Sequence, residues 1–179
     1  MKSFLIAVAA ILLFSFNCPA QEHAREDCNR HAEPLGGFSF CVPEGWSVEE
    51  REGNKYKMVF APRATTFTPN INVKDETSSY SLNDYVAASI KTILDKREEI
   101  GATSIKPAGQ IEFVTNSRLK GIRVAFLTEY RGLMVRTLQY YFDAGNNHKI
   151  LATGTALEET KETYDKVFDT ALRSFQIDR

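Results

Sequence analysis

The sequence is poor in the residues and motifs on which most catalytic sites depend. It has only three histidines and three cysteines in 179 residues. It contains neither a Gly-x-Ser-x-Gly nucleophile motif nor a glycine-rich phosphate-binding loop. Its formal net charge is −1, with 22 basic and 23 acidic side chains mixed along the chain. A basic face for nucleic acid or for an anionic membrane surface is therefore not expected. We expect no catalytic site, no cofactor, no metal and no nucleic-acid partner.

The first twenty residues are typical of a secretory signal peptide. Lys2 precedes an apolar run over residues 4–16, and the segment closes with the small residue Ala20. The run is shorter than the about 20 residues that a transmembrane helix needs, so no membrane span is expected. The layout predicts cleavage between Ala20 and Gln21 and export to the periplasm or the medium. The alternative is a lipoprotein that is cleaved before Cys18 and acylated there.

Cleavage after Ala20 leaves two cysteines, Cys28 and Cys41. Two thiols in an oxidising compartment normally pair, so we predict a Cys28–Cys41 disulfide. The bond would tie a polar arm, residues 21–36, to the first predicted strand. We expect the arm to be extended, with no strand or helix of its own.

The spacing of apolar residues predicts the remaining elements. Alternation with a period of two predicts short strands, and spacing near 3.6 predicts helices. The expected strands cover residues 38–42, 46–48, 56–60 and 71–73, and an antiparallel sheet follows from Gly109 to Thr155; the expected helices cover residues 82–94 and 164–175. The strand at residues 134–142 is apolar on both faces, which is typical of a central strand.

Several side chains are given specific places in this scheme. Tyr56, Met58 and Phe60 are expected to share the inward face of their strand. Ser81 should cap the first helix, with Asp84 three residues on, and Gly101 should end it. In the second helix, the expected core residues are Phe168, Leu172 and Phe175. The simplest burial of these faces is one α+β domain, residues 37–179, with helices covering an antiparallel sheet.

The order of these landmarks resembles the PsbP-like superfamily. The landmarks are the strand at Phe38–Val42, the turn Pro43-Glu44-Gly45-Trp46, the strand within Pro69–Val73, the helix at 82–94, an antiparallel meander and a C-terminal helix. The resemblance implies a sheet sandwiched by helices in a non-enzymatic scaffold whose members mostly bind or assist other proteins. No binding motif of a member matches here, so no functional residue is carried over.

One group of residues could be considered as metal ligands. His23, Cys28 and His31 lie close together in the arm, and histidine and cysteine are good zinc ligands. The paired ligand spacing of a closed zinc site is missing, and a disulfide would consume Cys28. We therefore expect a solvated arm.

Catalytic candidates are few. His148 follows a predicted turn, where a histidine is usually solvated. Glu112, Glu129 and Asp143 lie in the predicted sheet and could in principle form a carboxylate pair for glycoside chemistry. Alternation along the strands predicts that these carboxylates lie at exposed positions of the sheet and do not form such a pair.

The remaining candidates form a predicted binding face. Arg123 and Arg136, near Tyr130 and Tyr140, could bind an anion or a peptide; the alternative is that the arginines form cross-strand salt pairs with Glu129. The function predicted from all these features is a monomeric, non-catalytic exported domain with a protein-binding or assembly role. Its partner would be an envelope or secreted protein. The alternative is a small-ligand-binding protein or a hydrolase whose site is not visible in the sequence.

Overall fold

The computed structural model describes residues 28–63 and 66–178. The expected signal peptide, its cleavage site and His23 lie outside these residues. The elements, in chain order, are β1 (Arg30–Glu33), β2 (Phe38–Cys41), β3 (Ser47–Glu49), β4 (Met58–Phe60), β5 (Asn70–Thr77), α1 (Leu82–Asp95), β6 (Ala102–Val114), β7 (Lys120–Tyr130), β8 (Leu133–Gly145), β9 (His148–Leu157), a single 3-10 turn (Glu158–Thr160), α2 (Lys161–Arg173) and β10 (Gln176–Ile177). Neither helix in the described part of the chain is long and apolar enough to cross a bilayer.

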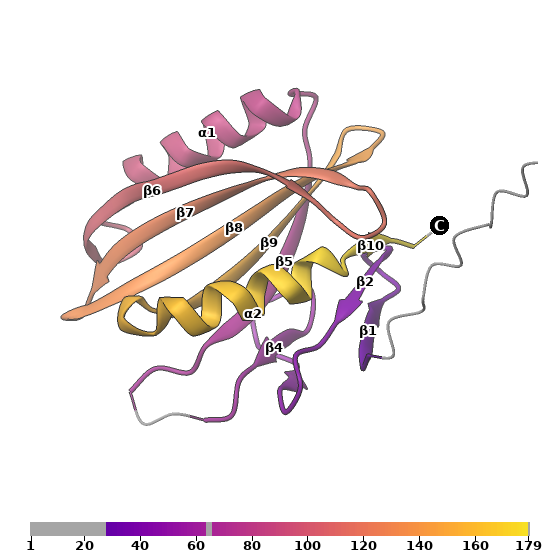
Figure 1. The fold of residues 1–179 in the computed structure, drawn as a ribbon. Helices are drawn as coiled ribbons and strands as arrows, with labels where there is room; N and C mark the ends of the chain where they lie inside the picture. Colours follow the sequence, from indigo (N-terminus) through magenta and orange to yellow (C-terminus); the bar gives the residue numbers. More distant parts are fainter. Residues whose placement is uncertain (1–27, 64–65, 179) are drawn as a thin grey trace, which may run out of the picture.

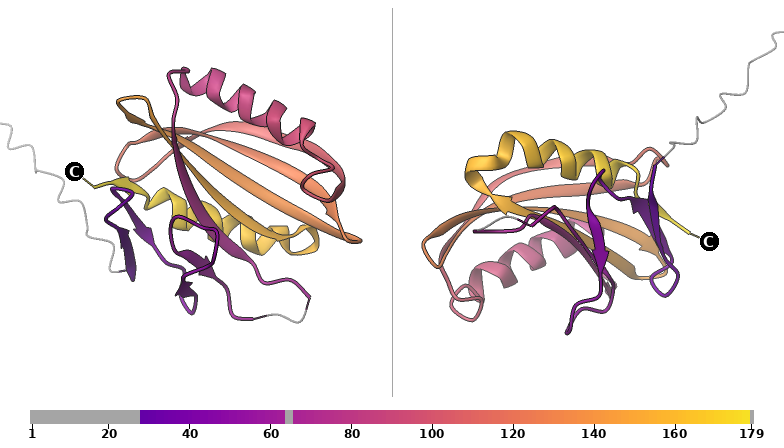
Figure 2. Two further views of the ribbon diagram at one scale, coloured as in Figure 1. Left: turned by 180° about the vertical axis from the view of Figure 1, so that it is seen from behind. Right: turned by 90° about the horizontal axis from the view of Figure 1, so that it is seen from below.

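A seven-stranded antiparallel sheet forms the centre of the molecule (Figure 1). Its strand order is β3-β4-β5-β9-β8-β7-β6, so β6 to β9 form a meander and β5 joins it beside β9. Helices α1 and α2 cover opposite faces of the sheet (Figure 2). A second, three-stranded sheet has the order β1-β2-β10. The predicted α+β sandwich is confirmed.

The larger core lies between the sheet and α2. Phe168 is 1% exposed, and Leu172 and Phe175 are fully buried, as predicted. The rings of Phe142 and Phe175 stack with their centres 5.0 Å apart. Strand β8 lies in the middle of the sheet and packs on both faces, since Phe142 belongs to the α2 core and Tyr141 to the α1 core. This confirms the prediction of a central strand.

The smaller core lies between the sheet and α1. The Ser81 hydroxyl accepts a hydrogen bond from the Asp84 N–H, which confirms the predicted cap. The helix ends at Asp95 rather than near Gly101, because residues 96–99 are all charged and offer nothing to bury. Gly101, at φ +76°, instead forms the turn into β6. Strand β6 therefore begins at Ala102, earlier than predicted from Gly109, and as an edge strand it shows little alternation.

Two further predictions are wrong. The arm is not free of structure, because β1 pairs with β2 and brings His31 opposite Phe40. In β4, Val59 is fully buried, whereas Met58 and Phe60 are half-buried. The register places Val59 opposite the buried Ile71, so these two side chains share the face that packs beneath α2.

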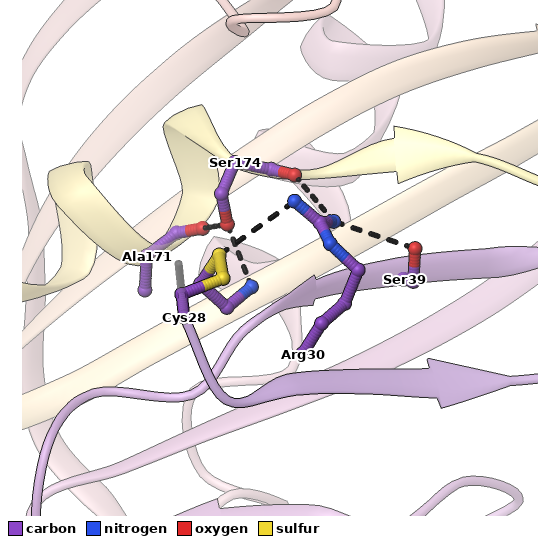
Figure 3. The surroundings of a disulfide bond; sticks show 6 residues. Cys28, Arg30, Ser39, Ala171 and Ser174 are labelled. Carbon is purple, nitrogen blue, oxygen red and sulfur yellow. Dashed lines mark hydrogen bonds between the residues drawn. A yellow bond between two sulfur atoms is a disulfide. The ribbon is translucent and has the colours of Figure 1, made fainter. Parts of the chain in front are cut away.

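The predicted Cys28–Cys41 disulfide is present, with Cα atoms 5.7 Å apart. Figure 3 shows that it lies at the C-terminal end of α2. The Cys41 N–H donates a hydrogen bond to the Ser174 hydroxyl at 2.7 Å, and Arg30 Nη1 donates to the Ser174 carbonyl at 3.1 Å. The loop between the cysteines spans 13 positions, and closing a loop of this length stabilises the fold by about 3 kcal/mol in the chain-entropy account. The bond thus fastens the segment before β1 to the end of β2, and the hydrogen bonds to Ser174 tie both to the end of α2.

Candidate binding groove beside helix α1

The four residues of the predicted binding face do not share a face. Arg123, Arg136 and Tyr140 point towards α2, where all three contact its acidic side chains. Tyr130 lies on the α1 side and lines an apolar cavity there. Arg123 and Tyr130 are an odd number of positions apart on one strand, and side chains alternate between faces. The predicted face is therefore corrected to two separate environments.

Arg123 and Tyr140 hold α2 against the sheet through one carboxylate. Arg123 Nη1 donates to Asp169 at 2.5 Å, and the Tyr140 hydroxyl donates to the other oxygen of Asp169 at 2.7 Å. Burial alone would lower the pKa of Arg123, but the hydrogen bond to Asp169 and the negative charges around the guanidinium together outweigh it, and the pKa is raised. Burial, followed by the charge of Asp169, raises the pKa of Tyr140. Both side chains stay protonated and serve the packing of α2.

Arg136 makes a second contact of the same kind. Its Nε lies 2.9 Å from both oxygens of Asp165, and its Nη1 lies 3.5 Å from Glu158. The hydrogen bond to Asp165 raises the pKa of Arg136. The arginines are thus paired, as the alternative prediction held, but with α2 and the turn before it, and not with Glu129.

His148 is not a solvated turn residue. It begins β9, and its Nε2 lies 2.9 Å from Asp75 Oδ2 on the neighbouring strand β5. Lys55 Nζ binds Asp75 Oδ1 at 2.7 Å. Burial would raise the pKa of Asp75, but hydrogen bonds from Lys55 and His148 outweigh it and lower the pKa. Among the described residues no serine or cysteine is bonded to His148, whose ring is hydrogen-bonded to Asp75.

The three carboxylates considered for glycoside chemistry do not form a pair. Glu112 on β6 lies opposite Ile122 on β7. Glu129 lies on β7 seven residues beyond Ile122, which at 3.4 Å per residue is a distance of about 24 Å. Asp143 is engaged by Lys149, whose Nζ lies 3.0 Å away. Glu112 and Glu129 are therefore too far apart to act as a general acid and a general base, and Asp143 is paired with a lysine.

The residues considered as metal ligands are also separated in the fold. Cys28 is consumed by the disulfide. His31 faces inward on β1, and its Nε2 lies 3.6 Å from Glu33 Oε2. No group of three or more histidine, cysteine, aspartate or glutamate side chains in residues 28–63 and 66–178 is placed to hold a metal ion.

A groove that the sequence did not predict runs between α1 and the sheet. Its apolar end is a cavity of about 250 Å³. The cavity is lined by Phe67, Ile93, Ile100, Ile105, Phe126, Thr128, Tyr130, Val135, Thr137 and Gln139. None of these ten side chains carries a formal charge. Ile100 is 47% exposed, which places it at the rim.

The other end of the groove is polar and has a volume of about 360 Å³. It shares Ile93 and Gln139 with the apolar end, so the two cavities lie next to one another. Its wall carries the buried phenol of Tyr85, whose hydroxyl donates to Glu76. Gln139 in the same wall accepts a hydrogen bond from the buried Tyr141 hydroxyl. Burial raises the pKa of both tyrosines. Protonated phenols cannot act as general bases at neutral pH.

Two rows of side chains on the sheet beside the groove are uncharged, whereas Lys74 and Glu76 of β5 line its polar end. One row across the strands is Thr137, Thr155 and Asn70, and the next is Gln139, Thr153 and Asn72. All six side chains are half-buried. Helix α1 packs over β6, β7 and β8, and its Tyr85 hydroxyl reaches Glu76 on β5. The hydroxyls of Thr137, Thr153 and Thr155 make no hydrogen bond to another described residue, so they are available to a ligand.

Sequence reasoning missed this groove because its lining comes from separate segments and contains no reactive residue type. Phe67 comes from the loop before β5, Ile93 from α1, Ile105 from β6 and Gln139 from β8. One signal was available. The outward positions of β8 and β9 carry threonine and glutamine where a solvated sheet face usually carries charges.

Comparison with protein-family models and with curated proteins finds no match. Solved structures do match. The cyanobacterial PsbP protein (CyanoP) of Synechocystis aligns with a TM-score of 0.62 and 14% identity, over 83% of this chain and 91% of that one. LpqN of Mycobacterium tuberculosis, described as involved in cell envelope biogenesis, gives 0.57 and 11% over 87% and 88%. The Ran-binding protein Mog1p of Saccharomyces cerevisiae gives 0.57 and 9% over 83% and 94%.

Identities this low establish a shared fold and no shared site. The alignments cover most of the chain. The resemblance found in the sequence is therefore confirmed at the level of structure. The chain has the PsbP-like fold.

Proposed function

We propose that this chain is an exported, non-catalytic domain that binds another protein through the groove beside α1, in an accessory or assembly role. The observation that carries the proposal is the groove itself. It joins an uncharged apolar cavity to half-buried hydroxyl groups that have no hydrogen-bond partner in the described chain. These hydroxyls can form hydrogen bonds with the polar groups of a partner that covers them.

The composition of the groove supports a protein partner. The centres of protein interfaces are depleted in charge and enriched in aromatic and apolar side chains, with a polar rim. Tyr80, 57% exposed, lies at the polar end, and Ile100 lies at the rim of the apolar end. The charged candidates of the sequence, Arg123, Arg136 and His148, are instead engaged in ion pairs within the fold.

The structural neighbours support an accessory or binding role in general terms. Mog1p is described as a Ran-binding protein and LpqN as a protein of cell envelope biogenesis. A fold hosts many functions, so the argument for binding rests on the groove, and the neighbours add only that the scaffold is used in this way elsewhere.

Export is part of the proposal. The signal-peptide pattern of residues 1–20 and the Cys28–Cys41 disulfide both favour an oxidising compartment outside the cytoplasm. N-terminal sequencing of the native protein is expected to start at Gln21. A chain that starts at a lipid-modified Cys18 would replace this proposal with an anchored lipoprotein.

A small-ligand-binding protein is the second candidate. The two ends of the groove, about 250 and 360 Å³, fall near the size range of small-molecule sites. The long row of threonine and asparagine side chains beyond the groove favours the larger, protein ligand, because a small molecule would leave most of that row uncovered.

Photo-crosslinking in the native compartment tests the proposal. A photo-reactive amino acid at Thr153 lies on the open sheet face, and the same residue at Thr170 lies on α2, on the opposite side of the sheet. We expect a discrete protein adduct from position 153 and none from position 170. Adducts at neither position, or at position 170 alone, would contradict a protein-binding groove beside α1.

A further inference from the structure

We infer that the groove beside α1 takes a short extended polypeptide segment, with one large apolar side chain seated in the cavity and uncharged polar residues lying over the sheet. This inference rests on the proposed function and names the chemistry of its ligand. Three features of the groove carry it: the size of the cavity, the lack of charge in its lining, and the spacing of the polar rows.

The cavity sets the size of the apolar side chain that anchors the segment. Its volume of about 250 Å³ corresponds to about eight water molecules at about 30 Å³ each. A side chain of up to about eight heavy atoms therefore fills it, which is the size of leucine, phenylalanine or tyrosine. A long acyl chain exceeds this space.

The lining sets the polarity of the anchor. The walls are Ile93, Ile105, Phe126, Val135 and their uncharged neighbours. An ionised side chain seated there would lose its hydration and gain no partner, which strongly disfavours binding. An apolar anchor loses only contacts with water and gains contacts with the walls.

The polar rows set the length of the segment. From Gln139 on β8 through Thr153 on β9 to Asn72 on β5, the row crosses two strand spacings. Strands lie about 4.8 Å apart and an extended chain advances about 3.4 Å per residue, so about three residues cover this row. The row offers hydroxyl and amide groups and no formal charge. Threonine, asparagine and backbone amides in the ligand match it.

Peptides of defined sequence test this inference. We would titrate acetyl-X-Thr-Asn-Thr-amide and the reversed acetyl-Thr-Asn-Thr-X-amide, with X as Phe, Leu, Ala or Asp, into the oxidised protein labelled at its isoleucine methyl groups. We expect the Phe or Leu peptides of one series to shift the signals of Ile93 and Ile105 and to bind at least tenfold more tightly than the Ala peptide. The Asp peptide is expected to shift neither signal.

A matched pair of variants locates the binding. Ile100 is 47% exposed at the rim of the cavity, and Ile111 is 49% exposed on β6 outside the groove. I100D is expected to weaken the Phe peptide at least tenfold, and I111D is expected to leave it unchanged. Equal weakening by both variants, equal affinity for the Phe and Asp peptides, or saturation of the cavity by dodecanoate with no response to any peptide would overturn the inference. If the photo-reactive residue at Thr153 captures a protein but none of the peptides binds, this inference is wrong and the proposed function still holds.

Discussion

The hydroxyl of Tyr140, in the centre of the sheet, donates a hydrogen bond of 2.7 Å to Asp169 of α2. Arg123 Nη1 occupies the other oxygen of the same carboxylate. Tyr140 is fully buried. One acidic side chain thus satisfies two donors beneath the helix, which makes Asp169 the polar group on which the packing of α2 most depends.

Removal of that carboxylate is expected to be costly. D169A leaves the buried Tyr140 hydroxyl and the Arg123 guanidinium without their shared acceptor, and we expect the free energy of unfolding to fall by about 2–3 kcal/mol. E162A, at an exposed position in the first turn of the same helix, should change it by less than about 1 kcal/mol. Urea unfolding of both variants measures the difference. Equal losses in the free energy of unfolding would show that Asp169 stabilises the fold no more than an exposed glutamate does.

The contact between β9 and α2 leaves no spare room. A Cβ built on Gly154 would lie 2.5 Å from the ring of Phe168. G154A is therefore expected to destabilise the protein by about 1–3 kcal/mol through overpacking, and F168A by about 3–5 kcal/mol through the cavity it leaves.

The two changes should not add. In the double variant the new methyl group of G154A occupies part of the space vacated by F168A, so its loss of stability should be smaller than the sum of the two single losses. Thermal or urea unfolding of the four proteins completes the cycle. Strict additivity would mean that Gly154 and Phe168 do not contact one another in the folded protein.

The hydrogen bonds from Lys55 and His148 to Asp75 predict that the stability of the fold depends on pH. Its folded-state pKa is lowered below the usual 3.8, with hydrogen bonds from Lys55 and His148 outweighing the effect of burial. A carboxylate with a depressed pKa contributes stability above its unfolded pKa, about 3.9, and this contribution is lost as the pH falls through the folded pKa. Wild type should therefore be more stable than D75N at neutral pH, and the difference should disappear as the pH falls below the folded-state pKa of Asp75.

His148 should contribute little to that gap. Its side chain is 36% exposed, and partly exposed ion pairs are worth less than about 1 kcal/mol. H148A should thus destabilise less than D75N and should leave partner binding unchanged. Unfolding curves at several pH values measure both effects. A gap that widens on acidification would contradict the role given to Asp75, and loss of an activity on H148A without loss of stability would contradict the non-catalytic proposal.

Strong periodic patterns predicted the parts of the fold that bury the most apolar surface. The stripe of Phe168, Leu172 and Phe175 identified α2, and the two-faced pattern of residues 134–142 identified the central strand. The cysteine count identified the disulfide. Each of these features can be predicted from a short stretch of sequence or from the number of cysteines, because it depends on burying one apolar face or on forming one disulfide bond.

The errors share the opposite cause. Strand β1 is polar and exists because β2 and the disulfide hold it, so its own residues give no signal. The face of β4 is set by its register with β5, and the start of β6 is set by the early end of α1. The partners of Arg123 and Arg136 come from a helix about 30 to 45 positions later in the chain. Contacts between distant segments decided all of these.

The binding groove beside α1 is the central claim, and the affinity of groove variants for the protein captured from Thr153 tests it most directly. T137R places a charge at the mouth of the apolar cavity, and T170R places the same charge on α2, on the other side of the sheet. Circular dichroism and unfolding curves should show both variants to be folded. The account predicts that T137R raises the dissociation constant at least tenfold and that T170R leaves it unchanged. Equal affinities for T137R and wild type, or a loss confined to T170R, would contradict it.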